Sequence, residues 1–116
     1  MKTDLNKRFY TFALDIVSLV RHLPKEMATY EIGRQLIRSG TSIAANYEEA
    51  KGGFSKDDFI YKINIAYKEA RETTFWLKLL EDSNIVKCGY LSSLRKESEE
   101  IRNILGTSVR TAKGNS

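Results

Sequence analysis

The chain has 116 residues, of which 41% are hydrophobic and 29% charged, with one proline and seven glycines. These proportions fit one soluble globular domain, and the scarcity of turn-forming residues excludes a sandwich of many short strands. The net charge of +4 comes from 19 Lys and Arg against 15 Asp and Glu. Residues 1–25 and 85–116 each carry +3, whereas 26–53 and 54–84 each carry −1. Such an asymmetry can mark an anionic partner.

The residue types that build cofactor and metal sites are scarce. Cys88 is the only cysteine and His22 the only histidine. One cysteine cannot form an intrachain disulfide, and a zinc site needs about four nitrogen or sulfur ligands. The paired Glu-x-x-His motifs of di-iron bundles also need a second histidine. We therefore expect no metal and no cofactor.

The sequence also lacks the marks of export and of membrane insertion. Its start, MKTDLNKRFY, contains neither an apolar run nor a small-residue cleavage site. No segment approaches the roughly 18 apolar residues of a membrane span. We expect a soluble cytoplasmic protein with no membrane partner.

The first predicted helix covers residues 4–23. Asp4 is a suitable N-cap, and Pro24 stops the helix. Apolar residues recur at intervals of three and four, which places them on one helical face. They are Phe9, Phe12, Ala13, Ile16, Leu19, Val20 and Leu23.

The second predicted helix covers residues 26–51. Gly40 lies inside it, where the missing side chain would let another backbone approach. The pair Gly52-Gly53 ends the helix, because glycine tolerates the left-handed conformation there. Its apolar residues follow the same helical spacing: Ile32, Leu36, Ile43, Tyr47 and Ala50.

The third predicted helix covers residues 55–82. Ser55 followed by Asp58 resembles a capping box, with Asp in place of the usual Glu. Asn84 is a candidate for the position that closes the helix. The expected core face consists of Phe59, Ile63, Ala66, Ala70 and Leu77.

The fourth predicted helix covers residues 90–109, and residues 111–116 are expected to fray. Its apolar positions alternate by three and four, as in a heptad pattern with one polar member. These positions are Leu91, Leu94, Ser98, Ile101 and Leu105.

These four segments predict an all-α fold, because no segment shows the alternation of a strand. Short connections favour antiparallel neighbours, so we expect an up-down four-helix bundle formed by one domain over residues 1–116. The first and last helices then lie side by side. Basic residues near both chain ends would form one surface, a candidate contact for RNA or DNA: Lys2, Lys7, Arg8, Arg102, Arg110 and Lys113.

A polar stripe follows the second predicted helix. At about 100° per residue its members fall within an arc of roughly 100°. The stripe consists of Gln35, Arg38, Ser39, Ser42, Asn46 and Glu49. Three interpretations stay open: a polar network inside the bundle or at a subunit contact, a plain solvent-exposed face, and a direct contact with a ligand or nucleic acid.

The third predicted helix carries a second apolar stripe besides its core face. A four-helix bundle buries about one face of each helix, so the second stripe indicates a homo-oligomer interface in which Trp76 is the anchor. The alternative is that these side chains fold over the bundle edge. The stripe consists of Tyr61, Ile65, Trp76 and Leu79, with Glu72 among them.

No catalytic signature is present: the sequence contains no G-x-S-x-G, P-loop, G-x-G-x-x-G or H-E-x-x-H motif. His22 has no evident nucleophile to activate. Cys88 follows Lys87, which can lower a thiol pKa, but an ordinary loop thiol is the commoner case. An enzyme would need a pocket with perturbed carboxylates, such as Glu49 with Glu72. We expect a protein that is not an enzyme.

Several of these positions form a pattern that covers about residues 8–82. The matching motif is Gln35-Leu36, Arg38-Ser39, Ser42-Ile43, Ala45-Asn46 and Glu49, then Lys56-Asp57, Asp58-Phe59, Ile65-Ala66 and Glu72. It resembles the four-helix bundle proteins encoded in intervening sequences of bacterial 23S rRNA genes, also called ribosomal S23-type proteins. One departure is Ala50, where the family usually has glycine.

The resemblance implies an up-down bundle that assembles as a ring-like homo-oligomer, typically a pentamer, and has no enzymatic activity. More distantly, the chain is similar to the accessory proteins of diversity-generating retroelements, basic pentamers that bind nucleic acid and a reverse transcriptase. This chain is less basic than those proteins. On this resemblance we expect Arg38, Asn46, Glu49 and Glu72 to hold helices or subunits together.

The function predicted from the sequence is an oligomeric helical scaffold that binds RNA or DNA through basic patches. The alternative is a protein–protein interaction module without a nucleic-acid role. In the first case binding weakens steeply with salt, because cations on the protein displace counterions from phosphates. In the second case an exposed apolar patch makes the contact, and binding is nearly independent of salt.

Overall fold

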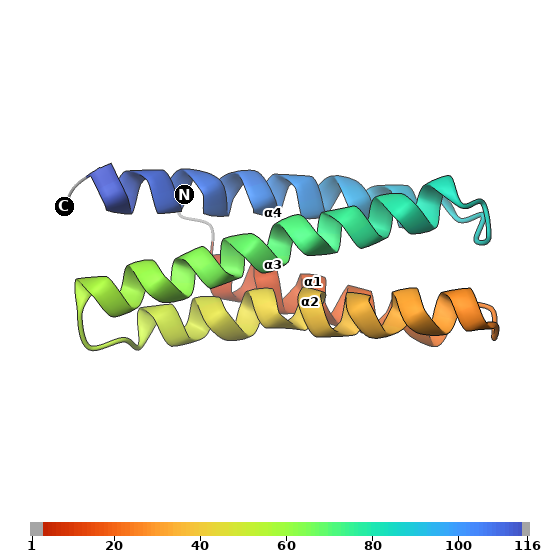
Figure 1. Ribbon diagram of the computed structural model, residues 1–116, viewed down its shortest axis with the longest axis horizontal. Coiled ribbons are helices and arrows are strands. Elements are labelled where there is room, and N and C mark those ends of the chain that lie inside the picture. The colour runs from red at the N-terminus through yellow and green to blue at the C-terminus, as the bar shows by residue number, and fades with distance from the viewer. Residues whose placement is uncertain (1–3, 115–116) are drawn as a thin grey trace.

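The computed structural model describes residues 4–114, which form an up-down bundle of four helices (Figure 1). Helix α1 spans Leu5–Arg21, α2 Met27–Lys51, α3 Lys56–Asp82 and α4 Gly89–Gly114. No strand occurs within the described residues, so the predicted all-α class is confirmed. The α1–α2 and α3–α4 loops lie at one end of the bundle, and the α2–α3 loop lies at the other.

Local hydrogen bonds explain where the helices begin. The carboxylate of Asp4 accepts from the backbone N–H of Lys7 at 3.1 Å, and the hydroxyl of Ser55 accepts from that of Asp58 at 3.1 Å. Both predicted N-caps are therefore confirmed. The start of α2 agrees with the prediction to within one residue, but its capping box, in which Glu26 and Thr29 bond reciprocally, was not predicted.

The helix ends differ in two places from the sequence prediction. Gly52 closes α2 with φ −92°, and no glycine in the described chain has a positive φ, so the prediction of a left-handed glycine is wrong. The N–H groups of Gly52 and Gly53 instead reach back to the carbonyls of Glu48 and Ala50. The left-handed residue is Asn84, with φ 59°, just after α3.

Helix α4 is longer than predicted. It continues through residues 111–114, so the expected fraying does not occur there, and residues 115–116 lie outside the described chain. The reason is packing: Val109 is part of the buried core, and Ala112 is half-buried. Lys2 also lies outside the described residues.

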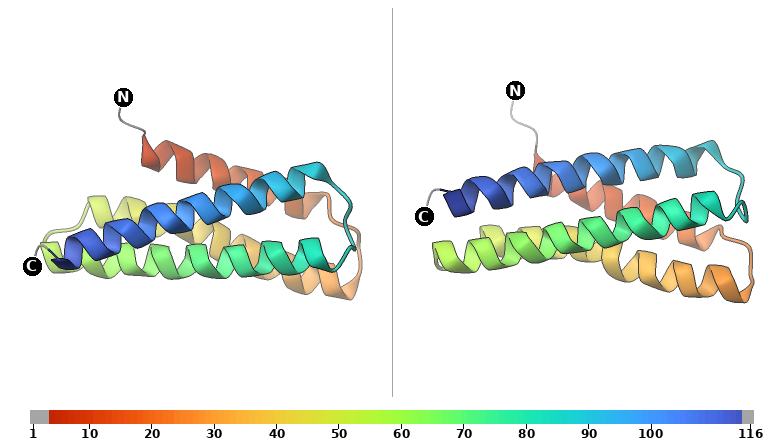
Figure 2. Two further views of the ribbon diagram at one scale, coloured as in Figure 1. Left: turned by 90° about the horizontal axis from the view of Figure 1, so that it is seen from above. Right: turned by 45° about the horizontal axis from the view of Figure 1, so that its top comes forward.

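The core runs along the bundle axis and joins residues of all four helices. Helices α2 and α3 and helices α3 and α4 pack most extensively, whereas α1 and α4 touch over a short stretch. With 17 residues α1 is much shorter than the other helices, and its N-terminal end lies away from α4 (Figure 2). The fully buried large side chains include Phe9, Phe12, Ile16, Leu36, Ile43, Ile63, Leu77, Leu80, Leu91, Ile101 and Leu105.

Two pairs of hydroxyl groups lie inside this core. The hydroxyl of Thr73 donates to Ser39 Oγ at 2.9 Å, and Thr74 Oγ1 lies 2.6 Å from Ser98 Oγ. Thr73 and Thr74 are adjacent on α3, so one links α3 to α2 and the other links α3 to α4. Ser98, the polar member of the predicted α4 pattern, is completely buried.

Gly40 allows α1 to pack closely on α2. A Cβ atom at this position would stand 3.1 Å from Cγ1 and 3.2 Å from Cγ2 of Ile16, which is completely buried. The neighbour is thus a branched side chain of α1, not the backbone that was predicted.

We therefore predict that Gly40→Ala destabilises the protein by about 1 kcal/mol. Alanine favours a helix over glycine by about 1 kcal/mol, but overpacking a core costs roughly 1–3 kcal/mol. Urea denaturation measures the free energy of unfolding. The matched control is Gly89→Ala, because a Cβ there meets no atom within 4 Å. A Gly40→Ala protein more stable than the wild type contradicts the argument.

Candidate functional site

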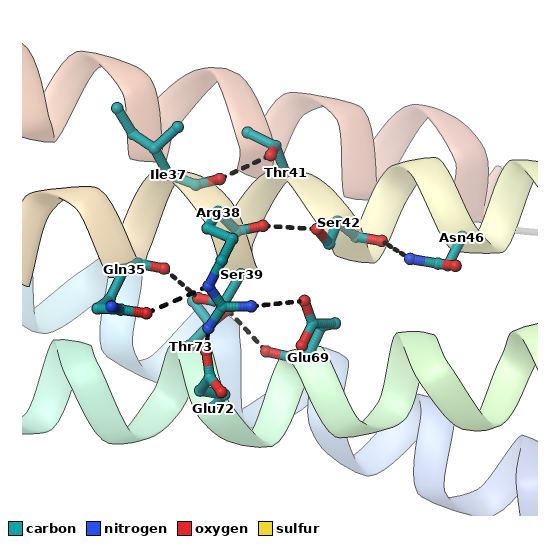
Figure 3. A network of polar contacts seen from close by, with 10 residues as sticks. All are labelled: Gln35, Ile37, Arg38, Ser39, Thr41, Ser42, Asn46, Glu69, Glu72 and Thr73. Carbon is teal, nitrogen blue, oxygen red and sulfur yellow. Dashed lines mark hydrogen bonds and ion pairs between the residues drawn. The ribbon is translucent and has the colours of Figure 1, made fainter.

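The central part of the polar stripe forms a network between α2 and α3 (Figure 3). We call it the Arg38 network, and its members are Gln35, Arg38, Ser39, Glu69, Glu72 and Thr73. The guanidinium of Arg38 lies 3.2 Å from Glu69 Oε2 and also pairs with Glu72. Its Nε donates to Gln35 Oε1 at 3.1 Å. One cation therefore holds two carboxylates of the neighbouring helix.

The remaining residues of the stripe lie outside this network. The hydroxyl of Ser42 donates to the Arg38 carbonyl at 2.6 Å, and the amide of Asn46 donates to the Ser42 carbonyl at 2.8 Å (Figure 3). These two side chains therefore bond to their own helix. Glu49 pairs with Lys62 of α3 at 2.8 Å, on the exposed edge of the bundle.

The carboxylates proposed for an enzyme do not meet. Glu49 accepts from Lys62, and this hydrogen bond raises the pKa of the Lys62 ammonium. Glu72 pairs with Arg38 instead. Glu49 and Glu72 therefore do not form the carboxylate pair that an enzyme would need, because they lie against different cations.

Two members of the network were missed from sequence, Glu69 and Thr73. Glu69 is only 8% exposed and Thr73 is completely buried. Both occupy positions of α3 that face α2, and the helical spacing 66–69–73 from the core residue Ala66 was the available signal. Charged and hydroxyl residues on that face were not assigned to the core because their partners come from another helix.

We predict that Arg38→Met destabilises the protein by about 2 kcal/mol. The change leaves the mostly buried Glu69 without its cation, and an unsatisfied charged group costs roughly that much or more. Replacing Glu69 and Glu72 by Gln in the same chain should recover part of the loss.

Thermal or urea unfolding measures the effect on stability. The control is Lys96→Met, which removes an exposed cation that joins no ion pair in the described part of the chain. Equal stabilities of Arg38→Met and Lys96→Met proteins would show that the network contributes nothing.

The basic residues predicted to form one surface are divided by the structure. Arg8 makes two hydrogen bonds to Glu97 of α4, at 2.7 and 2.8 Å, and lies 3.6 Å from Glu100. Hydrogen bonding to Glu97 raises the pKa of Arg8, against the opposing effect of partial burial. Arg8 is therefore engaged in joining α1 to α4, while Lys7 is exposed.

The basic residues of α4 lie on the side of the helix opposite to Glu97 and Glu100. Arg102, Arg110 and Lys113 fall within an arc of about 80° at 100° per residue. A Cβ at Gly106, between them, would stand 3.1 Å from Cε1 of Tyr67 and 3.4 Å from Nη1 of Arg110. The guanidinium of Arg71 lies 5.8 Å from the centre of the same tyrosine ring.

We call this area the α3–α4 basic surface; it comprises Arg71, Arg102, Arg110 and Lys113. None of the ion pairs found among residues 4–114 uses Arg71, Arg102 or Arg110. Arg71 was missed from sequence, because the packing of the bundle decides which helix lies beside α4 on this face.

The predicted oligomer stripe on α3 is partly exposed. Tyr61 and Leu79 are 64% and 42% exposed, whereas Ile65 and Trp76 are half-buried. Phe75, which was not predicted, is 56% exposed and packs edge-on against Trp76. Within the described residues, the buried indole nitrogen of Trp76 has no hydrogen-bond partner.

A groove runs between α1 and α2. It has a volume of about 360 Å³, and its lining is mostly apolar or small. The lining residues are Tyr10, Ala13, Leu14, Val17, Thr41, Ala44, Ala45 and Glu48. A second hollow of about 230 Å³ continues along the same two helices toward their loop and includes Ile37, Tyr30 and Arg34.

The two residues considered as catalytic candidates, His22 and Cys88, lie in no catalytic arrangement with other side chains of the described chain. His22 Nδ1 lies 2.7 Å from the Ser18 carbonyl, and Cys88 is exposed and free. Across residues 4–114, no group of three or more His, Cys, Asp or Glu side chains is placed to hold a metal ion. None of the helices in that range is long and apolar enough to cross a membrane.

Comparison with known proteins connects this bundle to a family. The sequence model of the 23S rRNA-intervening sequence protein family matches residues 1–107. No curated protein matches the chain. One similar crystal structure, at 1.70 Å resolution, is of a protein of unknown function from the S23 ribosomal protein family of Bacteroides thetaiotaomicron VPI-5482. It is 38% identical, with a TM-score of 0.81 over 90% of this chain and 96% of that chain.

The match to the family therefore extends over both sequence and fold. The matched range contains the residues of the Arg38 network, and the four helices of the described residues are those that the resemblance implied. The chain belongs to the 23S rRNA-intervening sequence protein family.

Proposed function

We propose that this protein is a non-enzymatic scaffold that assembles with copies of itself and binds RNA or DNA. The observation that carries the proposal is the α3–α4 basic surface, where Arg71, Arg102 and Arg110 have no carboxylate partner among residues 4–114. Cations on one face that no carboxylate neutralises suit the phosphates of a nucleic acid.

The position of these cations favours contact with a nucleic-acid backbone over the reading of bases. They lie along helix surfaces, and successive α4 cations are eight and three residues apart, about 12 and 5 Å along the axis. Tyr67 is half-buried between the helices, so it offers little ring surface for base stacking. Binding that tolerates many sequences and falls with salt is expected.

The proposed self-association rests on the α3 stripe. Exposed Phe75 and Leu79 beside the unsatisfied indole of Trp76 form the kind of apolar and aromatic cluster that anchors interfaces. An oligomer repeats a weak basic surface several times and thereby raises its avidity for a long polyanion. We propose a ring, and the family resemblance implies a pentamer.

A second candidate function is a protein–protein interaction module without nucleic acid. The groove between α1 and α2 supports it, because Tyr10 and Leu14 are 62% and 54% exposed beside that groove. The two functions differ in their salt dependence, since an apolar contact releases few counterions.

For the nucleic-acid function we predict that Arg102→Gln with Arg110→Gln weakens binding to a labelled RNA hairpin. The double variant should also reduce the slope of log K against log salt by about two units, because each lost phosphate contact removes roughly one. Fluorescence anisotropy over a salt series measures both quantities.

The control for this experiment is Lys7→Gln with Lys96→Gln, which changes the net charge equally but leaves the α3–α4 basic surface intact. The control should lower the slope less. Identical slopes for the two double variants would indicate a general charge effect, and absence of binding by the wild type at low salt would end the nucleic-acid proposal.

For self-association we predict a mass well above the 13.3 kDa of one chain by light scattering. Phe75→Ser should lower that mass, because it removes an exposed apolar group from the contact without opening the core. Its circular dichroism spectrum should match that of the wild type. A wild-type mass of 13.3 kDa contradicts the oligomer.

A further inference from the structure

We propose that the groove between α1 and α2 receives the exposed face of α3 from a second copy of this chain. This inference rests on the proposed self-association and assigns the two surfaces that meet. We call the donor surface the α3 ridge; it comprises Tyr61, Lys68, Phe75, Leu79 and Asp82. The acceptor is the α1–α2 groove described above.

The shapes of the two surfaces are complementary. The α3 ridge carries three large exposed side chains, Tyr61, Phe75 and Leu79. The groove is concave, and small residues line its α2 side, namely Thr41, Ala44 and Ala45. Large side chains of one helix packing between small residues of others is the usual way in which helices interlock.

The charged residues on both surfaces are complementary in one alignment of α3 from one copy with α2 from the other. Lys68, Phe75 and Asp82 follow one another at seven-residue intervals on α3, as do Arg34, Thr41 and Glu48 on α2. If the two helices run antiparallel with Phe75 over Thr41, the other members meet about 10 Å away on either side. Lys68 then faces Glu48, and Asp82 faces Arg34, so both flanking contacts join opposite charges.

The groups needed for these contacts are accessible. Lys68 and Glu48 are exposed, and neither takes part in an ion pair among the described residues. Arg34 and Asp82 pair only with exposed neighbours on their own helices, at 3.5 and 3.9 Å. Such surface ion pairs contribute less than about 1 kcal/mol to stability, so either residue can readily change its partner.

A second copy is the occupant because the chain carries both surfaces. Each protomer leaves two apolar areas uncovered, on α3 and on the α1–α2 face. A head-to-tail contact covers both, whereas a two-fold contact between two α3 ridges covers one and leaves Tyr10 and Leu14 exposed. Head-to-tail contacts generate a ring when the rotation closes.

Charge reversal of the full chain tests this register. Glu48→Lys alone and Lys68→Glu alone should each lower the mass measured by light scattering, because each places like charges together. The chain carrying both changes should regain the wild-type mass, since the two exchanged charges are again opposite in sign across the contact. Both positions are exposed, and thermal unfolding of each variant at low concentration checks that the bundle is intact.

The outcomes separate this inference from the self-association on which it rests. A wild type of one-chain mass contradicts both. An assembled wild type whose mass responds to Lys68→Glu but not to Glu48→Lys means that α3 ridges pair with each other, and overturns the groove as acceptor. Failure of the double variant to regain mass while both single variants lose it also overturns the proposed register.

Discussion

The buried hydroxyl pairs on α3 set the register of the bundle on which every surface depends. Thr73 reaches Ser39 of α2, and Thr74 reaches Ser98 of α4, at the same level of the molecule. Apolar packing alone tolerates sliding of one helix past another. Ser39, Thr73 and Thr74 also donate to carbonyls of their own helices, but among the described residues the buried hydroxyl of Ser98 has Thr74 as its partner. A shift by one turn would break both links between helices and leave Ser98 unsatisfied, at a cost of about 1–3 kcal/mol. Helix α3 therefore fixes the position of both its neighbours.

This register also determines what the outer surface carries. Arg38 precedes Ser39, so the alignment that joins Ser39 to Thr73 also brings the guanidinium to Glu69 and Glu72. Glu72 lies where the exposed part of α3 begins, next to Phe75 and Trp76. The Arg38 network thus acts inside one chain, where it holds α2 against α3, and shapes only indirectly the face that other molecules meet.

The sequence predicted those features that one helix determines by itself. Apolar spacing indicated four helices, and the N-caps at Asp4 and Ser55 follow from local hydrogen bonding. Features that need two helices were predicted less well. Arg8 was expected beside Arg102, but it faces Glu97, because the rotation of α4 decides which side meets α1. Glu69 and Phe75 were missed for the same reason, because their surroundings depend on neighbouring helices. Glu69 pairs with Arg38 of α2, whereas no helix of the described residues covers Phe75.

The short α1 has a consequence for how the chain folds. Most of the packing in the bundle joins helices that are consecutive in sequence, and α1 meets α4 over a short stretch only. The entropy lost in closing loops is then small, and chains with such local contacts fold quickly, in about microseconds to milliseconds. The association between α1 and α4 spans the greatest separation in the chain, so closing it costs the most loop entropy. During synthesis on the ribosome, the contacts of α1 with α2 and of α2 with α3 do not have to wait for α4.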